Sequence, residues 1–244
     1  MMRETGSKKH ETGNVKQDGH ASCLIPPASG GRSHALLFES PDLTLLPSLG
    51  ERAYSITRQR FGNTMKMYAP LYLSNICQNS CPYCSFAKNN FIQRRALKID
   101  EVIAEADALT SAGHRHILLV AGEDPKNVTV DFLEKVALAL RPKVANLLIE
   151  VQPLGYEGYR RLHMAGVDGV TLYQETYDQT AYKKFHPVGN KSDYIARLKA
   201  TEDAGRAGMR FLGIGALLGL SDWRKEALAL YKHATFLSKK FWKA

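Results

Sequence analysis

Three of the four cysteines in this 244-residue chain lie in one short stretch, SNICQNSCPYCSF at residues 74–86. They are Cys77, Cys81 and Cys84, in a C-x3-C-x2-C spacing. Cysteine thiolates bind zinc or iron–sulfur clusters, and a cubic four-iron cluster held by three thiolates keeps one iron open to a further ligand. A closed structural zinc site needs four ligands, and a disulfide framework needs an even number of cysteines. Three thiolates therefore indicate a metal site in which one coordination position is left open to another ligand.

The fourth cysteine, Cys23, lies far upstream in the stretch KQDGHASCLIPPASGG. This stretch has neither hydrophobic periodicity nor strand character, so we do not expect Cys23 to be the fourth ligand. A zinc knuckle completed by a distant histidine is the alternative to a cluster. Structural zinc loops normally pair their ligands in two groups, which disfavours that alternative.

Strands and helices alternate along the chain from residue 68 onward. The apolar runs predict strands, and the segments with helical periodicity predict helices. The expected strands cover 68–75, 116–124, 146–153, 168–176 and 210–220, and the expected helices cover 100–113, 129–141, 156–166, 192–208 and the segment from 221. This pattern predicts an α/β fold with a parallel sheet, organised as a partial TIM-type barrel of five βα units. A doubly wound sheet is the alternative topology.

Two helices carry specific expectations. Asp100 is the expected N-cap of the first helix, and Gly113 is expected to end it. The last helix carries an apolar stripe at helical spacing that we expect to dock on the sheet. The stripe comprises Trp223, Ala227, Leu230, Tyr231, Ala234 and Leu237.

Polar residues follow each expected strand. The cysteine loop follows the first strand, and GED, EVQP, QET and GLSD lie at the ends of the next four. In parallel barrels the chemistry lies at the carboxyl ends of the strands. We therefore expect these segments to meet at one edge of the sheet.

The cysteine triad, with Tyr83 directly before the last cysteine, resembles the signature of the radical S-adenosylmethionine enzymes. This resemblance implies a 4Fe-4S cluster on the three cysteines and S-adenosylmethionine bound at the open iron, where its cleavage gives a 5′-deoxyadenosyl radical. It also implies that Tyr83 lies beside the adenine and that Glu123, in AGED, binds the methionine ammonium. Gly213 and Gly215, in GIGALLG, would allow the backbone to approach the adenine, or could equally be packing glycines.

The resemblance implies further site residues with less specific roles. Gln174 or Glu175 is expected near the ribose or the substrate, as catalytic residues at a strand end. Lys191 and Arg197 could bind a carboxylate of the cofactor or substrate, or could lie on an exposed helix face. His186, in HPVG, is a candidate proton carrier, although a lone loop histidine usually has no such role.

Several further motifs resemble 2-iminoacetate synthase, the tyrosine lyase of thiazole and thiamine biosynthesis. They are ITRQRFGN, PLYLSNIC, EVQPL, VTLYQETY and GALLGLSDWR. The resemblance implies cleavage of the Cα–Cβ bond of L-tyrosine to 2-iminoacetate (dehydroglycine) and p-cresol. It implies thiazole synthase as a partner and an electron donor such as flavodoxin or ferredoxin. The alternatives are the tyrosine lyase of hydrogenase cofactor maturation and a non-catalytic iron–sulfur protein.

Composition limits the remaining possibilities. The net charge is +9, but the basic residues are scattered, so we expect no nucleic-acid partner. No apolar run reaches the length of a membrane span, and few cysteines suggest a reducing, cytoplasmic compartment. Residues 1–34 read as a disordered tail, and 35–244 as the barrel domain. We expect that domain to be incomplete at its C-terminal end, because the radical enzymes it resembles need at least six strands.

Overall fold

The computed structural model describes residues 43–242. The predicted disordered tail and Cys23 lie outside this range, and so does the predicted domain boundary at residue 35. The described residues contain one five-stranded parallel sheet. Its strands are β1 (Ala69–Ser74), β2 (His116–Ala121), β3 (Asn146–Glu150), β4 (Gly169–Thr171) and β5 (Phe211–Gly213).

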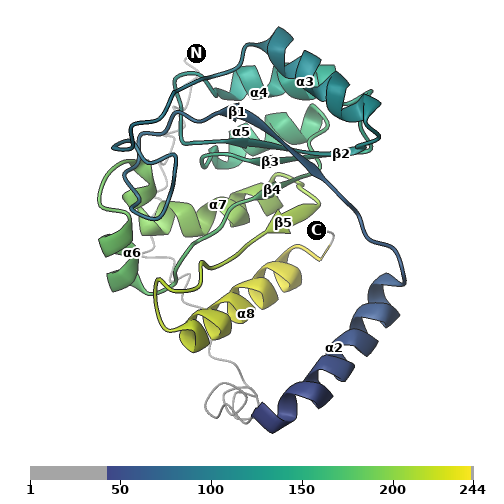
Figure 1. The fold of residues 1–244 in the computed structure, drawn as a ribbon, viewed down its shortest axis with the longest axis vertical. Helices are drawn as coiled ribbons and strands as arrows, with labels where there is room; N and C mark the ends of the chain where they lie inside the picture. The colour runs from purple at the N-terminus through teal and green to yellow at the C-terminus, as the bar shows by residue number, and fades with distance from the viewer. Residues whose placement is uncertain (1–42, 243–244) are drawn as a thin grey trace, which may run out of the picture.

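The strands lie in the sheet in their order along the chain, β1-β2-β3-β4-β5 (Figure 1). A doubly wound sheet reverses direction at a switch point, so strands that are neighbours in sequence become separated in space. Here each βα unit adds its strand beside the previous one, as in a barrel. The α/β prediction with five βα units is confirmed, and the doubly wound alternative is excluded.

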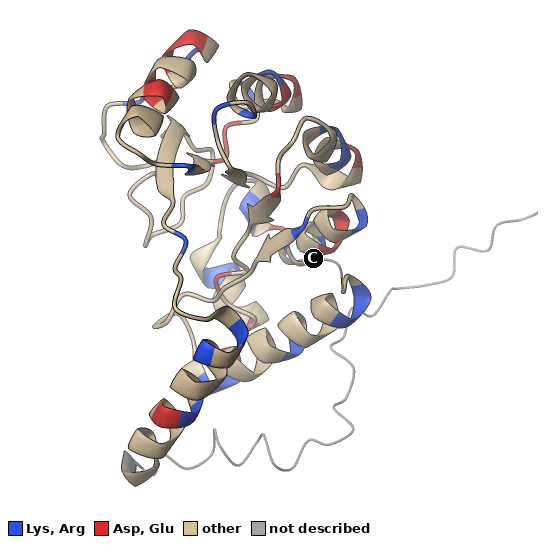
Figure 2. Ribbon diagram, turned by 90° about the vertical axis from the view of Figure 1, so that its right-hand side faces the viewer, with Lys and Arg blue, Asp and Glu red and all other residues tan. Residues whose placement is uncertain are grey.

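Helices connect the strands and cover one side of the sheet. Figure 2 shows them side by side in an arc outside the strands, and neighbouring helices are in contact. The connecting helices are α3 (Ile99–Ser111), α4 (Val130–Leu140), α5 (Gly155–Met164) and α7 (Tyr194–Arg206), and α8 (Trp223–Lys240) follows β5. The expected positions of all five helices are confirmed to within a few residues.

The core lies between this helical layer and the sheet. Leu119 of β2 and Leu147 and Ile149 of β3 are fully buried against Val136 and Leu140 of α4. Thr129 caps α4 as its side chain accepts from the amide of Phe132, and Pro142 follows its end. These contacts place the carboxyl ends of β1 to β5 along one edge.

Four elements of the described residues were not predicted. They are η1 (Leu43–Leu45), α2 (Leu46–Phe61), α6 (Gln179–Phe185) and η2 (Asn190–Ser192). Helix α2 has no buried residue and extends away from the sheet in Figure 1. Helix α6 and η2, in contrast, lie between β4 and α7 and carry residues of the strand-end site.

Two of the helix expectations are wrong in detail. Helix α3 begins after Lys98 rather than Asp100, because the Glu101 carboxylate accepts from the Lys98 amide and caps the helix two residues earlier than an Asp100 cap would. Gly113 follows the end of this helix with a φ of 93°, as expected. In α8 the apolar stripe is not the buried face.

The buried residues of α8 are Glu226, His233 and Leu237, whereas Trp223 and Tyr231 are each 49% exposed. Only Leu237 of the expected stripe is buried, so α8 docks mainly through polar side chains. The hydrogen bonds that cause this lie between α8 and the segment after β4. Glu226 accepts from the Thr176 hydroxyl and the Tyr177 amide, and His233 lies 2.8 Å from the Tyr177 hydroxyl.

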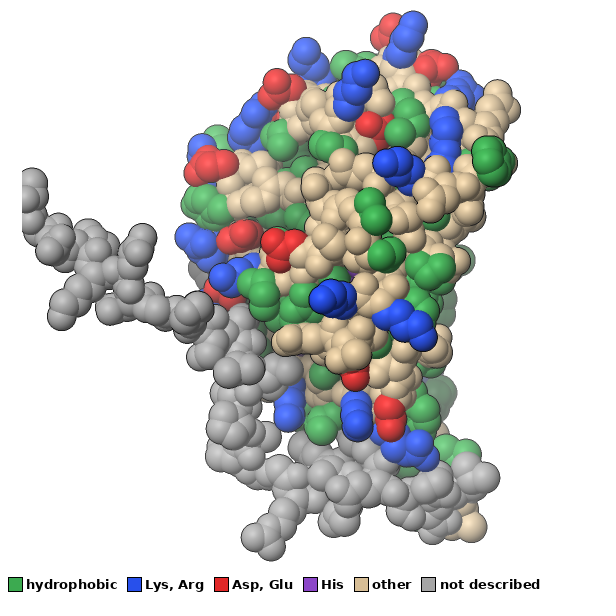
Figure 3. All heavy atoms as spheres, turned by 90° about the vertical axis from the view of Figure 1, so that its left-hand side faces the viewer, with side chains coloured by type: hydrophobic (Ala, Val, Ile, Leu, Met, Phe, Trp, Pro, Cys, Tyr) green, Lys and Arg blue, Asp and Glu red, His purple; other side chains and the backbone are tan. Residues whose placement is uncertain are grey.

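The surface carries dispersed charge. Figure 3, which views the face where the cysteine loop and α6 lie, shows Lys and Arg scattered among hydrophobic and acidic side chains. Among residues 43–242, no helix combines the length and the apolar character needed to cross a membrane.

Candidate active site

The three cysteines lie in the long loop between β1 and α3. Cys81 is buried, and Cys77 and Cys84 are half-buried. The Arg94 guanidinium holds this loop by donating to four of its backbone carbonyls, at distances of 2.6 to 3.0 Å. Those carbonyls belong to Asn75, Phe86, Ala87 and Asn90. The sequence did not identify Arg94, because an arginine that binds backbone carbonyls leaves no motif.

The loop rests directly on the segment that follows β2. Gly122 is buried, and a Cβ atom there would lie 2.3 Å from the carbonyl oxygen of Ile76. The amide of Gln78 donates to the carbonyl of Glu123 at 3.1 Å. Gly122 is therefore required by the close approach of the cysteine loop. The AGED element and the cysteine loop form one unit.

The three thiols influence one another. Burial raises the pKa of Cys81, Lys191 opposes this shift, and the neighbouring Cys84 and Cys77 add to it. Within residues 43–242, no group of three or more His, Cys, Asp or Glu is placed to hold a single metal ion. Three thiols in one loop are the donor set of a cubic cluster with one open iron. The residues present fit that group.

Glu123 and Arg197 form a buried ion pair opposite the loop. The Arg197 guanidinium donates to Glu123 Oε1 at 3.1 Å and to the carbonyl of Tyr173 at 2.7 Å. Both side chains are more than nine-tenths buried. Glu123 Oε2 is buried without a hydrogen-bond partner. A buried carboxylate oxygen normally has a donor, so Oε2 is an acceptor whose hydrogen bond is still unmade.

Lys191 and Glu175 form a second ion pair beside the first. The Lys191 ammonium lies 2.7 Å from Glu175 Oε1, and an Arg197 nitrogen lies 3.9 Å from the same oxygen. The ammonium also lies over the Tyr83 ring, 5.7 Å from its centroid. Neither cation lies on an exposed helix face, which was the alternative to a site role. Both face the strand-end site, with η2 and the start of α7 as their supports.

Tyr83 and His186 are joined by a hydrogen bond. The distance from the Tyr83 hydroxyl to His186 Nε2 is 2.6 Å, and His186 Nδ1 lies 2.9 Å from the carbonyl of Tyr182. A carbonyl can only accept, so Nδ1 carries the proton and Nε2 accepts from Tyr83. Burial, assisted by Lys191, lowers the pKa of His186 to about 4, and burial raises the pKa of Tyr83. Both side chains are neutral near pH 7.

Asn79 connects the cysteine loop to the segment after α6. Its Oδ1 accepts from the Lys191 amide at 3.1 Å, and its Nδ2 lies 3.6 Å from Cys77 Sγ. Gly189 has a φ of 91°, and a Cβ there would lie 2.1 Å from Asn79 Oδ1. The HPVGNK segment is thus held against the cysteine loop. Sequence reasoning missed Asn79, although it lies inside the quoted cysteine stretch.

Gln152, after β3, is a further residue that the sequence left without a role. Its Nε2 donates to the Val128 carbonyl at 2.7 Å, which fixes the orientation of the amide. Its Oε1 is buried and has no partner. Gln152 and Glu123 both line a cavity of about 420 Å³ that Lys191 and Arg197 also border. Two acceptors without donors thus face a cavity with two cations.

The remaining predicted residues lie near the site but are occupied by packing. Gln174 is buried and donates to the Tyr194 carbonyl at 3.3 Å. A Cβ on Gly213 would lie 2.7 Å from Thr171 Oγ1, and a Cβ on Gly215 would lie 2.8 Å from the Tyr173 ring. Packing against the end of β4 and the residues directly after it is enough to require both glycines. The roles expected for these three residues stay predictions.

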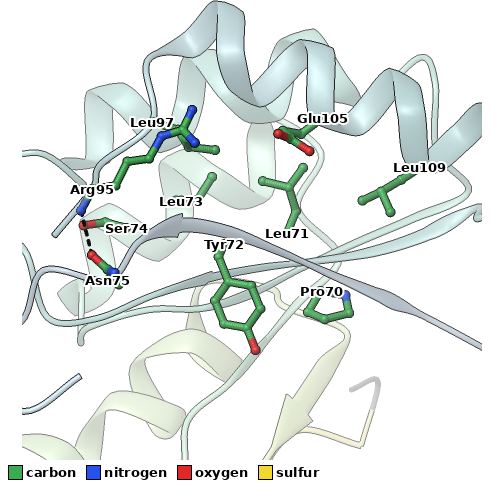
Figure 4. A pocket seen from close by; sticks show the side chains of 10 residues that line it. All are labelled: Pro70, Leu71, Tyr72, Leu73, Ser74, Asn75, Arg95, Leu97, Glu105 and Leu109. Atoms are coloured by element: carbon green, nitrogen blue, oxygen red, sulfur yellow. Dashed lines mark hydrogen bonds between the residues drawn. The ribbon is translucent and has the colours of Figure 1, made fainter. Parts of the chain in front are cut away.

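A second cavity, of about 370 Å³, lies away from this chemistry, between the free edge of β1 and α3 (Figure 4). Leu71, Leu97 and Leu109 give it an apolar lining, and Glu105 borders it. Ser74 and Asn75, at the end of β1, border it, but none of the cysteines and neither ion pair of the strand-end site does. The larger cavity, bordered by Glu123 and Gln152, is the candidate active site.

Comparisons with known proteins agree with this geometry. The chain is 42% identical to 2-iminoacetate synthase of Escherichia coli (strain K12) over 231 residues, covering 94% of this chain and 58% of that protein. It is 42% identical over 200 residues to the enzyme of Salmonella typhimurium (strain LT2), covering 82% of this chain and 53% of that protein. The chain therefore spans only a little over half the length of these curated relatives.

Among solved structures, the FeFe-hydrogenase maturase HydG from Carboxydothermus hydrogenoformans matches with a TM-score of 0.80 and 36% identity. The match covers 85% of this chain and 49% of that one. The family model of the radical SAM superfamily matches residues 71–231, which include most of β1, all of β2 to β5 and all the site residues described above. The chain therefore belongs to the radical SAM superfamily.

Proposed function

We propose that this chain carries the cluster-binding and cofactor-binding part of a radical S-adenosylmethionine tyrosine lyase of the 2-iminoacetate synthase type. Such an enzyme cleaves the Cα–Cβ bond of L-tyrosine to 2-iminoacetate and p-cresol. The observation that carries the choice of this reaction within the superfamily is the 42% identity over 231 residues. The strand-end geometry supports the cofactor chemistry independently of that identity.

Cys77, Cys81 and Cys84 would hold a 4Fe-4S cluster. When bound, the cluster and S-adenosylmethionine supply a 5′-deoxyadenosyl radical that removes a hydrogen atom from the substrate. The cysteine loop is held in place by Arg94 and by its contact at Gly122. Burial of the site excludes water from the reacting atoms.

The cavity residues would bind an amino-acid group of the cofactor. Glu123 Oε2 and Gln152 Oε1 are the two acceptors without donors, so an ammonium group would satisfy both. Lys191 and Arg197 supply positive charge for a carboxylate in the same cavity. His186 accepts from Tyr83 and so fixes the ring next to the cysteines, where the adenine is expected.

The hydrogen bond between Tyr83 and His186 bears on whether that histidine carries a proton or positions the tyrosine. Its Nδ1 proton is bound to a carbonyl, and its Nε2 is occupied by the Tyr83 hydroxyl. We propose that His186 positions Tyr83, and that any proton transfer through His186 passes through that hydroxyl. Glu175 remains the proposed catalytic carboxylate, because its oxygen meets both cations of the site.

The proposed reaction implies partners outside the chain. L-tyrosine is the substrate, thiazole synthase receives the 2-iminoacetate, and a reduced carrier such as flavodoxin or ferredoxin donates the electron. A cytoplasmic location is consistent with free thiols at the cluster site. These assignments rest on the similarity to 2-iminoacetate synthase.

Product analysis tests the proposal. The full chain, loaded anaerobically with iron and sulfide, is reduced with dithionite in the presence of S-adenosylmethionine and L-tyrosine. We expect 5′-deoxyadenosine together with p-cresol and glyoxylate, the hydrolysis product of 2-iminoacetate. Formation of 5′-deoxyadenosine without p-cresol would contradict the tyrosine lyase assignment. A loaded cluster that never cleaves S-adenosylmethionine would favour a non-catalytic iron–sulfur protein.

The structural match to HydG favours a second candidate, the tyrosine lyase reaction of hydrogenase maturation. That reaction makes carbon monoxide and cyanide in addition to p-cresol. Headspace analysis for carbon monoxide in the same assay separates the two. We expect none, because the identity to 2-iminoacetate synthase is 42% and the identity to HydG is 36%.

A further inference from the structure

Glu175 has an unusual backbone. Its φ is 69°, and among residues 43–242 it is the only non-glycine residue with a positive φ. L-residues avoid this region because Cβ approaches the backbone, so the surrounding structure must hold the residue there. The Leu217 amide donates to the Glu175 carbonyl at 2.7 Å. That hydrogen bond fixes the Glu175 carbonyl. The rest of the conformation must be held through the two residues that follow Glu175.

Thr176 and Tyr177 are both bound by one carboxylate from α8. The Thr176 hydroxyl donates to Glu226 Oε1 at 2.6 Å, and the Tyr177 amide donates to Glu226 Oε2 at 2.8 Å. Thr176 is fully buried, and Glu226 is 2% exposed. Both oxygens of Glu226 are therefore used on the two residues directly after Glu175.

Glu226 lacks the partner that a buried carboxylate usually has. Within residues 43–242 no Lys, Arg or His lies within ion-pair distance of it, and only the first turn of α8 offers it a favourable dipole. Burying a carboxylate without a cation is costly even when it accepts hydrogen bonds. An apolar side chain at this position would dock α8 at lower cost, so docking alone does not account for a carboxylate here.

A second polar contact supports the same segment. The Tyr177 hydroxyl lies 2.8 Å from His233 Nδ1 on α8, and the Tyr194 hydroxyl donates to the Tyr177 carbonyl at 3.1 Å. These bonds hold the Tyr177 side chain and carbonyl. They leave the Tyr177 amide, next to Glu175, to Glu226. The Thr176 hydroxyl donates its proton to Glu226 and also accepts from the Asp178 amide at 3.2 Å.

We propose that Glu226 is a positioning residue of the active site. By binding Thr176 and the Tyr177 amide, it keeps Glu175 in its left-handed conformation, with the carboxylate on Lys191 and Arg197. This inference rests on the proposed function only in placing Glu175 in the cofactor site. Helix α8 thus contributes to the site without touching it.

The first test measures backbone order without cofactor. Hydrogen–deuterium exchange is followed in Glu226→Leu for the segment around Glu175 and for β2. We expect roughly tenfold faster exchange at the Tyr177 and Leu217 amides, because local opening loses the hydrogen bonds that oppose it. Exchange in β2 should be unchanged. Unchanged exchange at both amides would overturn the proposal, whatever reaction the enzyme catalyses.

The second test measures coupling to the site by S-adenosylmethionine affinity, using equilibrium dialysis of the cluster-loaded chain. We expect roughly tenfold weaker binding for Glu226→Leu, as for the loss of one charge-assisted contact. Combining Glu226→Leu with Glu175→Gln should weaken binding no further than the worse single variant does. Additive losses would show that Glu226 acts by another route, and the proposal would be wrong.

Two further variants separate positioning from helix docking. Leu237→Ala weakens the apolar contact of α8. It should leave the affinity for S-adenosylmethionine unchanged even where it destabilises the fold as much as Glu226→Leu does. Glu226→Gln should restore binding, because its amide can accept from the Tyr177 amide and donate to Thr176. A loss in Leu237→Ala equal to that in Glu226→Leu, or no rescue by glutamine, would overturn the proposal. If Glu226→Leu fails to fold, Thr176→Val replaces it and is expected to weaken binding less.

Discussion

The two halves of the sheet are built differently. Strands β1, β2 and β3 have six, six and five residues, whereas β4 and β5 have three each. In the first half, apolar side chains of the strands pack against the helical layer. The backbone hydrogen bonds between the strands continue to the strand ends. In the second half the strands end after three residues, although backbone hydrogen bonds continue the pairing as far as Glu175. Buried polar side chains also hold the chain there. The difference separates the part that stabilises the fold from the part that arranges the site.

The contrast is clearest at the ends of β2 and β4. After β2, Gly122 lets the cysteine loop lie directly on the strand end, so backbone contacts are sufficient. After β4, Glu175 is held in a strained conformation by side chains from η2, α7 and α8. After β2, close packing of the backbone makes a glycine the essential residue. After β4, the strained backbone makes a network of charged side chains essential.

The largest expected effect comes from closing the space on which the cysteine loop rests. Gly122→Ala places a methyl group 2.3 Å from the Ile76 carbonyl, so the loop must shift. We expect the variant to incorporate little iron and sulfide during anaerobic reconstitution, measured colorimetrically. Gly50→Ala is the control, since nothing lies within 4 Å of its added Cβ. Normal cluster content in Gly122→Ala would show that the loop does not depend on this contact.

A core substitution in the first half tests where the stability lies. Leu147 of β3 is fully buried, so Leu147→Ala should lower the free energy of unfolding by about 2–5 kcal/mol. Urea denaturation of the metal-free chain measures this loss. Leu138→Ala, at a side chain that is 59% exposed on α4, is the matched control and should change stability little. Equal losses in the two variants would show that the buried core at Leu147 does not carry the stability of the first half.

His186 makes the free energy of unfolding depend on pH. Its folded pKa of about 4 lies below the usual value of 6.5, so the unfolded chain binds more protons between these pH values. The stability from neutral His186 is present above pH 6.5 and is lost as the pH falls towards 4. His186→Gln should therefore flatten the decline in unfolding free energy over this range. His233, whose pKa burial also lowers, keeps part of the decline.

The groups facing His186 are Tyr83, Tyr182, Lys191, Glu175 and Arg197. None of them is changed in the His186→Gln variant, so the comparison isolates the imidazole. Chemical denaturation at a series of pH values measures the slope. An unaltered slope would mean that His186 titrates normally and is not held neutral by the site.

The smallest expected effect is at Gln152. Its Oε1 has no partner within the protein, so Gln152→Leu removes only the bond from Nε2 to Val128. We expect a small change in stability and roughly fivefold weaker S-adenosylmethionine binding, which is the size of one lost hydrogen bond. Tyr159→Phe, on α5 and outside the lining of this cavity, is a control that removes another buried polar atom without a partner. Equal binding by wild type and Gln152→Leu would remove Gln152 from the site.

The sequence was most informative in the first half of the molecule. The apolar runs that form β1, β2 and β3 have strong periodicity, and a cysteine spacing is local information. The expected strands at 168–176 and 210–220 proved much longer than β4 and β5. Their apolar character was visible, but the point where the ladder ends depends on partners elsewhere in the chain.

The second half of the sheet and its helices were harder to predict from the sequence, because their partners also lie elsewhere in the chain. Helix α6 has seven residues, QTAYKKF, which are too few to show a helical period. The buried face of α8 could not be predicted, because the partners of Glu226 lie about fifty residues away at Thr176 and Tyr177. Gln152 lay inside a quoted motif, yet its unpaired oxygen is visible only in three dimensions.

The proposed function depends above all on the cysteine loop being a cluster site. The most direct measurement compares iron, acid-labile sulfide and 5′-deoxyadenosine in the anaerobically reconstituted chain and in Cys81→Ala. We expect about four irons and four sulfides per chain with S-adenosylmethionine cleavage in the wild-type chain, and loss of both the cluster and the cleavage in Cys81→Ala. Zinc without sulfide in the wild-type chain, or full cleavage by Cys81→Ala, would contradict it.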